Sequence, residues 1–250
     1  MAKQEFNTIG KNIFEFRYDP IISFYDWKGA LAEHLIKEMG FDGFRIAQNR
    51  IDLVNPDEQD FLVFVSTHNA GLVFENNSDK EVIKGKIDKF LSALEKFDKF
   101  KPKKIVRIGA RWNLLLHKRN TTFGQLKDTF ESYVVQLNKS PYKNFKEDLV
   151  DIGLPLNFKG EEYNYNIMHG PMDQGQALTQ FFTNKLVYFD NSGNVKSEIP
   201  KHGFFFDIDV FKIELGEIDI KKVKELSKQF VDVGKEKFDS LSSDFFNQVK

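Results

Sequence analysis

Two stretches of this chain carry charged residues at a spacing that suits ligand binding. Arg107, Arg111 and Asn113 lie an even number of residues apart, as do Asp207 and Asp209. In a β-strand such residues share a face, so each stretch would present like charges side by side. If the two strands are neighbours or face each other across a concave sheet, the side chains form an ion-pair ladder or line a pocket in which arginine binds a phosphate or carboxylate. A cross-strand salt-bridge network carries the greater weight, and adjacent strands would favour it.

The two aspartates suggest a different chemistry as well. Two carboxylates on one strand are common in metal-dependent nucleases and phosphatases, because hard cations prefer oxygen ligands. A third ligand is not evident, since Glu214 is out of register and no H-E-x-x-H or EF-hand spacing occurs. A phosphoryl-transfer or nuclease-like enzyme using Asp207 and Asp209, with Arg107 or Arg111 steadying the phosphate, is kept as the alternative. No metal site and no cofactor are expected.

His169 is the histidine of most interest for a binding site. We expect it in a turn, because it stands in Met168-His169-Gly170-Pro171 after an aromatic strand. A histidine in a turn is more often polar surface than a functional group. His169 is nevertheless kept among the candidate ligand-binding residues.

Residues 96–104 interleave five lysines with two phenylalanines. Such a segment could contact a phosphate backbone through its lysines and stack rings on bases. The same spacing suits a helix end, where lysines favour the negative end of the helix dipole. Nucleic-acid binding is the second alternative and is ranked last; its candidate residues are Lys99, Lys101, Lys103 and Lys104.

Several enzyme classes are excluded by residue type. The chain has no cysteine, which rules out a thiolate nucleophile, a disulfide, a zinc ribbon and an iron–sulfur cluster. Residues 170–177 have the glycine spacing of a P-loop, but Gln176 and Ala177 stand where lysine and serine or threonine are required. No G-x-S-x-G elbow is present. These absences favour a non-enzymatic binding or interaction protein.

The composition is that of a folded soluble chain. Of 250 residues, 41% are hydrophobic and 29% charged, which argues against disorder and against a membrane protein. With a formal charge of −1, the protein as a whole does not attract nucleic acid or an anionic membrane electrostatically. The first residues lack the apolar run of a signal peptide, so we expect a cytoplasmic protein. The expected partners are another protein, a further copy of the chain or a small anionic ligand.

Residue periodicity places these candidates on particular elements. Residues 104–118 place an apolar residue at every second position from Val106 to Leu116, as a long strand with one apolar face does. Residues 79–99 carry apolar residues at helical spacing after a Ser78 or Asp79 cap. We expect strands over 12–18, 44–54, 60–75 with a bend or hairpin at 69–71, 104–118, 149–159, 163–168, 186–189 and 203–214. We expect helices over 26–39 with Asp26 as cap, 79–99, 121–137, 174–182 and 219–248, the last with a bend at Gly234.

The order of these elements predicts an α+β fold. We expect a largely antiparallel curved sheet, or two joined sheets, with helices packed on one side and a long C-terminal helix. Residues 1–250 are expected to form a single compact domain, because no linker rich in Gly, Ser or Pro divides them. The halves 1–118 and 119–250 are candidates for two coupled subdomains.

Four features together resemble a sporadically distributed family of uncharacterised bacterial proteins of about this length. They are the strand at 14–18 with sequence Phe-Glu-Phe-Arg-Tyr, the strand at 106–113, the Asp207–Asp209 strand and a late Phe238 in the terminal helix. Ala110 and Trp112 are variants of the family pattern, and the likeness spans nearly the whole chain. The resemblance implies no known activity. Its patchy distribution implies a factor of phage defence or of mobile elements that acts with a partner.

Overall fold

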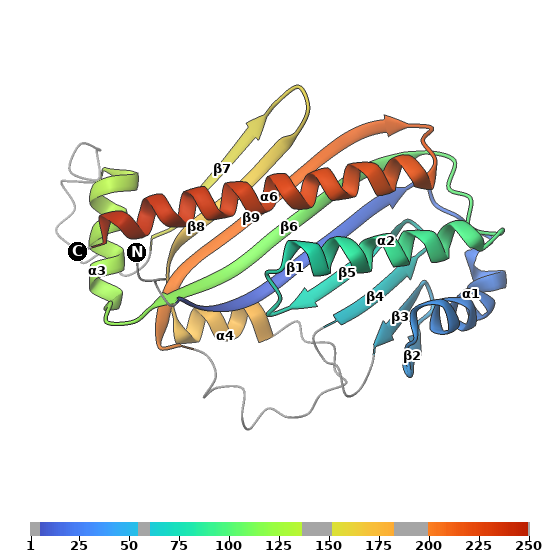
Figure 1. Ribbon diagram of the computed structural model, residues 1–250, viewed down its shortest axis with the longest axis horizontal. Helices are drawn as coiled ribbons and strands as arrows, with labels where there is room; N and C mark the ends of the chain where they lie inside the picture. Colours follow the sequence, from blue (N-terminus) through green and yellow to red (C-terminus); the bar gives the residue numbers. More distant parts are fainter. Residues whose placement is uncertain (1–5, 55–60, 137–151, 183–199, 250) are drawn as a thin grey trace.

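The computed structural model describes residues 6–54, 61–136, 152–182 and 200–249. Within these residues the chain forms one nine-stranded sheet in the order β2-β3-β4-β5-β1-β6-β9-β8-β7 (Figure 1). The strands are β1 (Phe6–Tyr18), β2 (Gly43–Ile46), β3 (Arg50–Val54), β4 (Phe61–Ser66), β5 (Asn69–Glu75), β6 (Ile105–Lys118), β7 (Leu154–Lys159), β8 (Asn164–Asp173) and β9 (His202–Gly216). The helices are α1 (Phe24–Met39), α2 (Lys80–Lys96), α3 (Phe123–Thr129), the π-helical η1 (Phe130–Val135), α4 (Gln174–Phe182) and α6 (Ile220–Gln248). The α+β fold with an antiparallel sheet and a long C-terminal helix is confirmed.

The centre of the sheet joins the two halves of the sequence. β6 pairs along its length with β1 on one side and with β9 on the other, both antiparallel. β6 belongs to residues 1–118 and β9 to residues 119–250, so both halves contribute to one continuous sheet. Ion pairs between β6 and β9 therefore link residues about 100 positions apart in the sequence.

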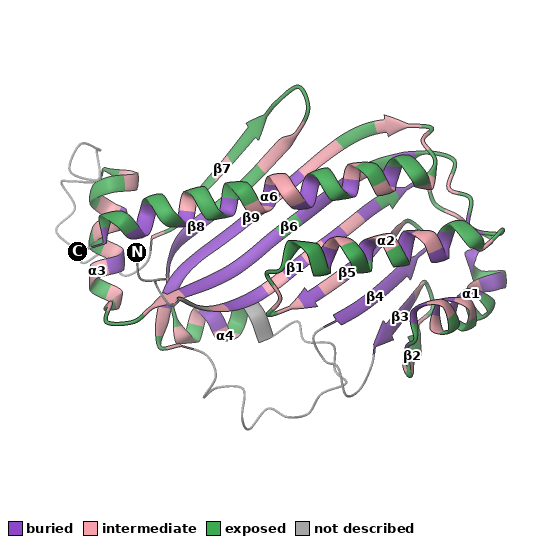
Figure 2. Cartoon of the chain, viewed as in Figure 1, coloured by how far each residue is buried: buried purple, intermediate pink, exposed green. Residues whose placement is uncertain are grey.

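One face of the sheet holds the main core under α1, α2 and α6. Residues of the middle strands are largely buried (Figure 2), and the largest side chains on this face are aromatic. Phe14 and Phe16 come from β1, Trp112 from β6, and Phe204 and Phe206 from β9. Burying a phenylalanine side chain stabilises a fold by about 1.5–3 kcal/mol, so this aromatic layer dominates the core.

Gly234 of α6 allows the helix to approach the sheet closely. A Cβ atom at this position would lie 2.5 Å from Nε1 and 2.6 Å from Cδ1 of Trp112. Real Cβ atoms do not approach other atoms so closely, so only glycine fits against the indole. The sequence suggested a bend at Gly234, and the contact supplies a different reason for the glycine.

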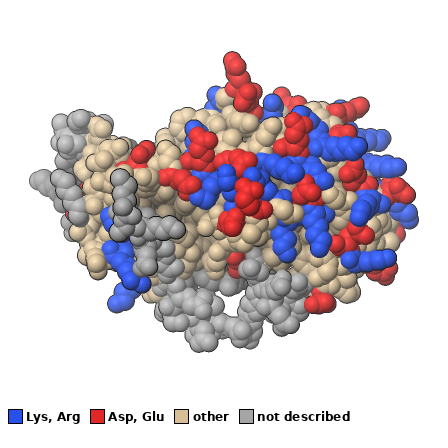
Figure 3. Space-filling model, in the orientation of Figure 1, with Lys and Arg blue, Asp and Glu red and all other residues tan. Residues whose placement is uncertain are grey.

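The outer surfaces of α2 and α6 are joined by ion pairs. Lys84 Nζ lies 3.0 Å from Asp232, and Lys228 Nζ lies 2.8 Å from Asp88. On this side of the molecule basic and acidic side chains alternate rather than forming patches of one sign (Figure 3). Exposed pairs of this kind contribute about 0–1 kcal/mol each, so they orient the helices more than they stabilise the fold.

The opposite face of the sheet, called the open face below, is covered by α4 at one end. Ala177 of α4 packs on Ile9, Leu115 and Phe205, which come from β1, β6 and β9. α4 is thus an exception to the expectation that helices pack on one side. Over the central strands the open face carries charged side chains, since residues that alternate with the aromatic core point there.

Several predicted boundaries were wrong. Residues 44–54 form a hairpin of β2 and β3 instead of one strand, with Ala47 N donating to Arg50 O at 2.8 Å across the turn. α1 begins at Phe24, after Ser23, so Asp26 lies in its first turn and is not its cap. Asp79 caps α2 as expected and accepts from two backbone N–H groups, but α2 ends at Lys96.

Two further predictions concern a strand late in the chain and the absence of a membrane-spanning segment. The predicted strand at 186–189 lies outside the described residues. In the described parts of the chain, none of the helices has both the length and the apolar character needed to cross a bilayer.

Candidate functional site

The arginine strand and the aspartate strand are neighbours, and their charged side chains meet on the open face. Arg111 lies opposite Asp209 in the register of β6 and β9. The ion pairs run diagonally: Arg111 Nε donates to Asp207 Oδ1 at 2.6 Å, and its Nη2 donates to Oδ2. Arg107 Nη2 donates to both oxygens of Asp209, at 2.8 and 2.6 Å. Each aspartate is therefore paired with one arginine, which is the salt-bridge network that the sequence favoured.

Burial changes the acid–base properties of this network. The side chains of Arg107 and Asp209 are 16% and 17% exposed, whereas that of Arg111 is 44% exposed. Burial raises the pKa of Asp209, and the Arg107 guanidinium opposes that rise. The hydrogen bond with Asp207 raises the pKa of Arg111. Burial therefore disfavours the ionised form of Asp209, and Arg107 favours it.

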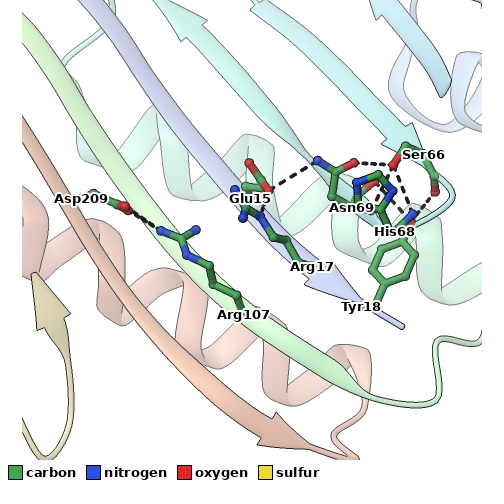
Figure 4. A network of polar contacts seen from close by, with 8 residues as sticks. All are labelled: Glu15, Arg17, Tyr18, Ser66, His68, Asn69, Arg107 and Asp209. Carbon is green, nitrogen blue, oxygen red and sulfur yellow. Dashed lines mark hydrogen bonds and ion pairs between the residues drawn. The ribbon is translucent and has the colours of Figure 1, made fainter. Parts of the chain in front are cut away.

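A third ion pair extends the network onto β1. Arg17 Nε donates to Glu15 Oε1, and Asn69 Nδ2 donates to the same oxygen at 3.4 Å (Figure 4). Sequence reasoning did not select Glu15 or Arg17 as site residues. The signal was present, because Glu15 and Arg17 alternate with aromatic residues along the strand. Only the pairing of β1 with β6 brings them beside Arg107.

Two glycines make room for this layer of charges. Gly71 and Gly109 lie directly opposite Glu15 on its two neighbouring strands. A Cβ on Gly109 would come within 3.1 Å of Arg107 Nη1, and one on Gly71 within 2.8 Å of Phe64 Cζ. Because glycine has no side chain, the Arg107 guanidinium and the Phe64 ring can lie close to the backbone at these two positions.

Aromatic rings hold the arginines in this flat arrangement. The Arg107 guanidinium lies 4.6 Å from the centroid of Phe211, and that of Arg50 lies 4.5 Å from the centroid of Phe64. Cation–π contacts of this kind contribute about 0.5–1 kcal/mol at partly exposed sites. Arg107 and Arg50 are therefore each held over an aromatic ring on the open face.

The layer encloses a small cleft of about 80 Å³. A single water needs roughly 10–15 Å³ by this measure, so the cleft has room for several waters or one carboxylate or phosphate group. In its hydrogen bonds to the described residues, Arg107 uses only Nη2 and Arg17 uses only Nε. The other N–H groups of these two guanidiniums can donate to a ligand. The cleft is lined by Ile13, Glu15, Arg17, Arg107, Gly109, Arg111 and Asp209.

Asn113 and His169 do not join this cleft. Asn113 lies on β6, two residues after Arg111, and is only 7% exposed. His169 lies inside β8 rather than in a turn, with its ring against Phe130, Phe204 and Phe206 in the aromatic core. Its buried Nδ1 has no hydrogen-bond partner among the described residues, and burial lowers its pKa.

The lysine segment begins at Lys96, the last residue of α2, and continues along the loop to β6. The candidate lysines Lys99, Lys101, Lys103 and Lys104 are all exposed. Its rings are not available to nucleic acid. Phe100 is 3% exposed and packs on Phe16 and Tyr18, and Phe97 contacts Trp27 and His34. The base-stacking part of the nucleic-acid hypothesis therefore fails, and only exposed positive charge remains.

The aspartates have no further carboxylate or histidine that would complete a cation site. Within the described ranges, no group of three or more acidic or histidine side chains could hold a metal ion. Each aspartate is also occupied by an arginine, which a cation would have to displace. The residues do not fit the metal-dependent alternative.

Two larger hollows lie away from the charged layer. One of about 460 Å³ is lined by residues of α3, η1 and the end of α6, including Gln125, Asp128 and Gln248. The other, of about 300 Å³, lies beside α4 and β8 and is lined by residues that include Met168 and Met172. Neither contains an arginine or aspartate of the network.

Comparison with known proteins adds no functional information. The chain matches no protein-family model, no curated protein and no solved structure. The resemblance described above therefore rests on its short motifs alone.

Proposed function

We propose that this chain is a non-enzymatic binding protein whose open sheet face takes up an acidic group, a carboxylate or a phosphate. The observation that carries the proposal is the cleft between β1 and β6, where three arginines converge and retain N–H donors that their own carboxylates do not use. Arginine presents these donors in a rigid fork that matches two oxygens of a carboxylate or a phosphate. The group could belong to a small ligand or to an acidic side chain of a partner protein.

The ordered surroundings also support binding over catalysis. The guanidinium of Arg107 is held by Asp209 and Phe211, so little conformational entropy is lost when a ligand arrives. No nucleophile and base lie together in the cleft, which is lined by arginines, acids, one isoleucine and one glycine. These features suit recognition.

Arg17→Gln is the cleanest test, because the Arg17 side chain is 51% exposed and its loss should leave the fold intact. The probes are inorganic phosphate, malonate and a short glutamate-rich peptide. A ligand at ten times its Kd stabilises the folded state by about 1.4 kcal/mol, which a thermal-shift assay detects. We expect at least one probe to stabilise the wild type, and Arg17→Gln to weaken this effect.

A matched pair of double variants separates the cleft from general charge effects. Arg107→Gln/Asp209→Asn removes an ion pair from the cleft, whereas Arg50→Gln/Asp52→Asn removes a similar pair on β3, which does not line it. Only the first should lose binding. Phosphate or malonate binding indicates a small ligand, and binding of the peptide alone indicates a partner protein. If no probe stabilises the wild type, or if both double variants bind equally well, the proposal is wrong.

A role in phage defence, which the family resemblance implies, is part of the same proposal. It predicts that cells carrying the wild-type gene resist some phages and that the Arg17→Gln gene loses this protection at an equal protein level. A plaque assay with matched expression checks it. Equal plaque numbers with and without the gene would remove this role and leave the binding proposal standing.

A further inference from the structure

The two outer strands of the sheet differ in how their free edges are built. β2 and β7 each pair with one neighbour among the described residues (Figure 1). An edge strand exposes a row of unpaired backbone N–H and C=O groups, onto which another extended chain can add. Natural proteins protect such edges with proline or with charged side chains.

β7 is protected in this way. Gly160 N donates to Tyr163 O at 3.1 Å, and antiparallel pairing alternates from that point. The backbone groups that point outward therefore belong to Pro155, Asn157 and Lys159. Pro155 has no N–H to offer, and Lys159 places a charge at the edge.

β2 contains no proline, and its one charged residue, Arg45, is not among those whose backbone groups point outward. Ala47 N donates to Arg50 O, so the residues whose backbone groups point outward are Phe44 and Ile46. Their side chains are 57% and 40% exposed, although they lie on the same side of the sheet as the buried core residues of β3. Unpaired backbone groups and exposed apolar side chains thus coincide on the same two residues.

An aromatic side chain of α1 extends this apolar edge. Lys28 Nζ donates to the carbonyls of Ala47 and Gln48 at 3.1 and 2.8 Å, and lies 5.8 Å from the Tyr25 ring centroid. Lys28 thereby places Tyr25, which is 48% exposed, beside the end of β2. A strand added to β2 would meet Phe44, Ile46 and Tyr25.

We propose that β2 is a docking strand for an extended peptide segment of a partner protein, which adds beside it and continues the sheet. In this mode main-chain hydrogen bonds provide affinity and alternate side chains provide specificity. Apolar residues two apart would lie against Phe44 and Ile46. The side chain of the residue between them would lie on the opposite side of the sheet, the side of Arg45 and Asp52, where a polar residue such as glutamate remains in solvent.

The size of the edge favours a peptide over a second copy of the chain. Stable interfaces between folded proteins bury about 1,600 Å² in total. A strand of four residues, Gly43–Ile46, with one aromatic neighbour offers far less than this. Strand addition requires only a short extended segment, so the peptide is the occupant that fits.

Fluorescence polarisation with labelled peptides tests the proposal. The probe is an eight-residue peptide in which valine and glutamate alternate, and its control has the same composition in two blocks. We expect the alternating peptide to bind at least about tenfold more tightly than the block peptide. Ile46→Pro removes an outward N–H and Phe44→Lys removes the apolar contact, and each should weaken binding by at least about tenfold.

Ile213→Lys is the matched control, since Ile213 is an exposed apolar residue of β9, far from β2 in the sheet order. It should bind like the wild type. Equal binding of both peptides, or wild-type affinity in Phe44→Lys, overturns the proposal. So does a wild-type dimer in sedimentation that Phe44→Lys dissociates, because a second copy would then cover β2. If circular dichroism shows that Ile46→Pro is unfolded, Phe44→Lys alone decides.

Discussion

Replacing Arg107 with glutamine probes the energetics of the charged layer. The substitution removes the cation that donates to both oxygens of Asp209 and leaves a carboxylate that is only 17% exposed. Removing one partner of a buried ion pair costs about 3–5 kcal/mol. Because some of this carboxylate still reaches water, we expect Arg107→Gln to lower the free energy of unfolding by about 2–3 kcal/mol at neutral pH.

This cost should depend on pH in a defined direction. Burial raises the pKa of Asp209 above 3.8, and Arg107 opposes that rise. Without the arginine the folded-state pKa rises further, while the unfolded-state pKa stays the same. A carboxyl whose folded pKa is raised contributes stability that is fully present below the unfolded pKa and is lost as pH rises through the folded pKa. The penalty of Arg107→Gln is therefore full at neutral pH and shrinks as the pH falls toward 3.8.

Urea unfolding, followed by tryptophan fluorescence at neutral and at mildly acidic pH, measures both effects. The control is Arg107→Gln/Asp209→Asn, which removes both charges and should recover a large part of the lost stability at neutral pH. Two results would refute the reasoning: a stability loss that is the same at both pH values, or a double variant no more stable than Arg107→Gln. Either would mean that Arg107 contributes by packing rather than by compensating Asp209.

Three other variants test separate features of the fold. Gly234→Ala should lower the free energy of unfolding by about 1–3 kcal/mol, because its Cβ would collide with Trp112. Gly85→Ala in α2, where a Cβ meets nothing within 4 Å, should raise the free energy of unfolding by about 0.5–1 kcal/mol, and chemical denaturation measures both. Burial lowers the pKa of His169 below 6.5, so its protonation weakens the folded state as pH falls; His169→Leu should therefore lose less Tm than the wild type across a pH series from about 7 to 5. Asp79→Ala should cost about 1 kcal/mol in urea unfolding, since it removes the side-chain cap of α2.

Local periodicity predicted most individual helices and strands but not which strands pair with one another. The alternation over residues 104–118 matches the middle of β6, from Arg107 to Leu114. It fails at the start of the strand, where Val106 is exposed and Ile105 is buried, because the pairing with β9 shifts between Ile105 and Arg107. The hairpin of β2 and β3 was missed because residues 47–50 contain neither glycine nor proline. The pairing of β6 with β9 depends on contacts about 100 residues apart, which no local pattern contains.

The same limit applied to the candidate site. The arginines and aspartates were recognisable from their spacing, but the contribution of Glu15 and Arg17 required the position of β1 beside β6. His169 was misplaced because Pro171 suggested a turn. In the structure β8 continues through Pro171, two residues after His169, the last residue paired with β7. The missing N–H of Pro171 faces the β7 side, where no described strand pairs with this part of β8.

The balance of charge on the open face determines what kind of ligand it can bind. Three arginines face Glu15, Asp207 and Asp209, so the layer carries no net charge and attracts a distant anion only weakly. Affinity must then come from the direction of the N–H groups that the carboxylates leave unused. A planar acid group that accepts from two arginines at once satisfies this condition, whereas a spherical ion such as chloride does not. Because screening acts on net charge at a distance more than on aligned hydrogen bonds, moderate salt should weaken such binding less than it weakens binding at a purely basic patch.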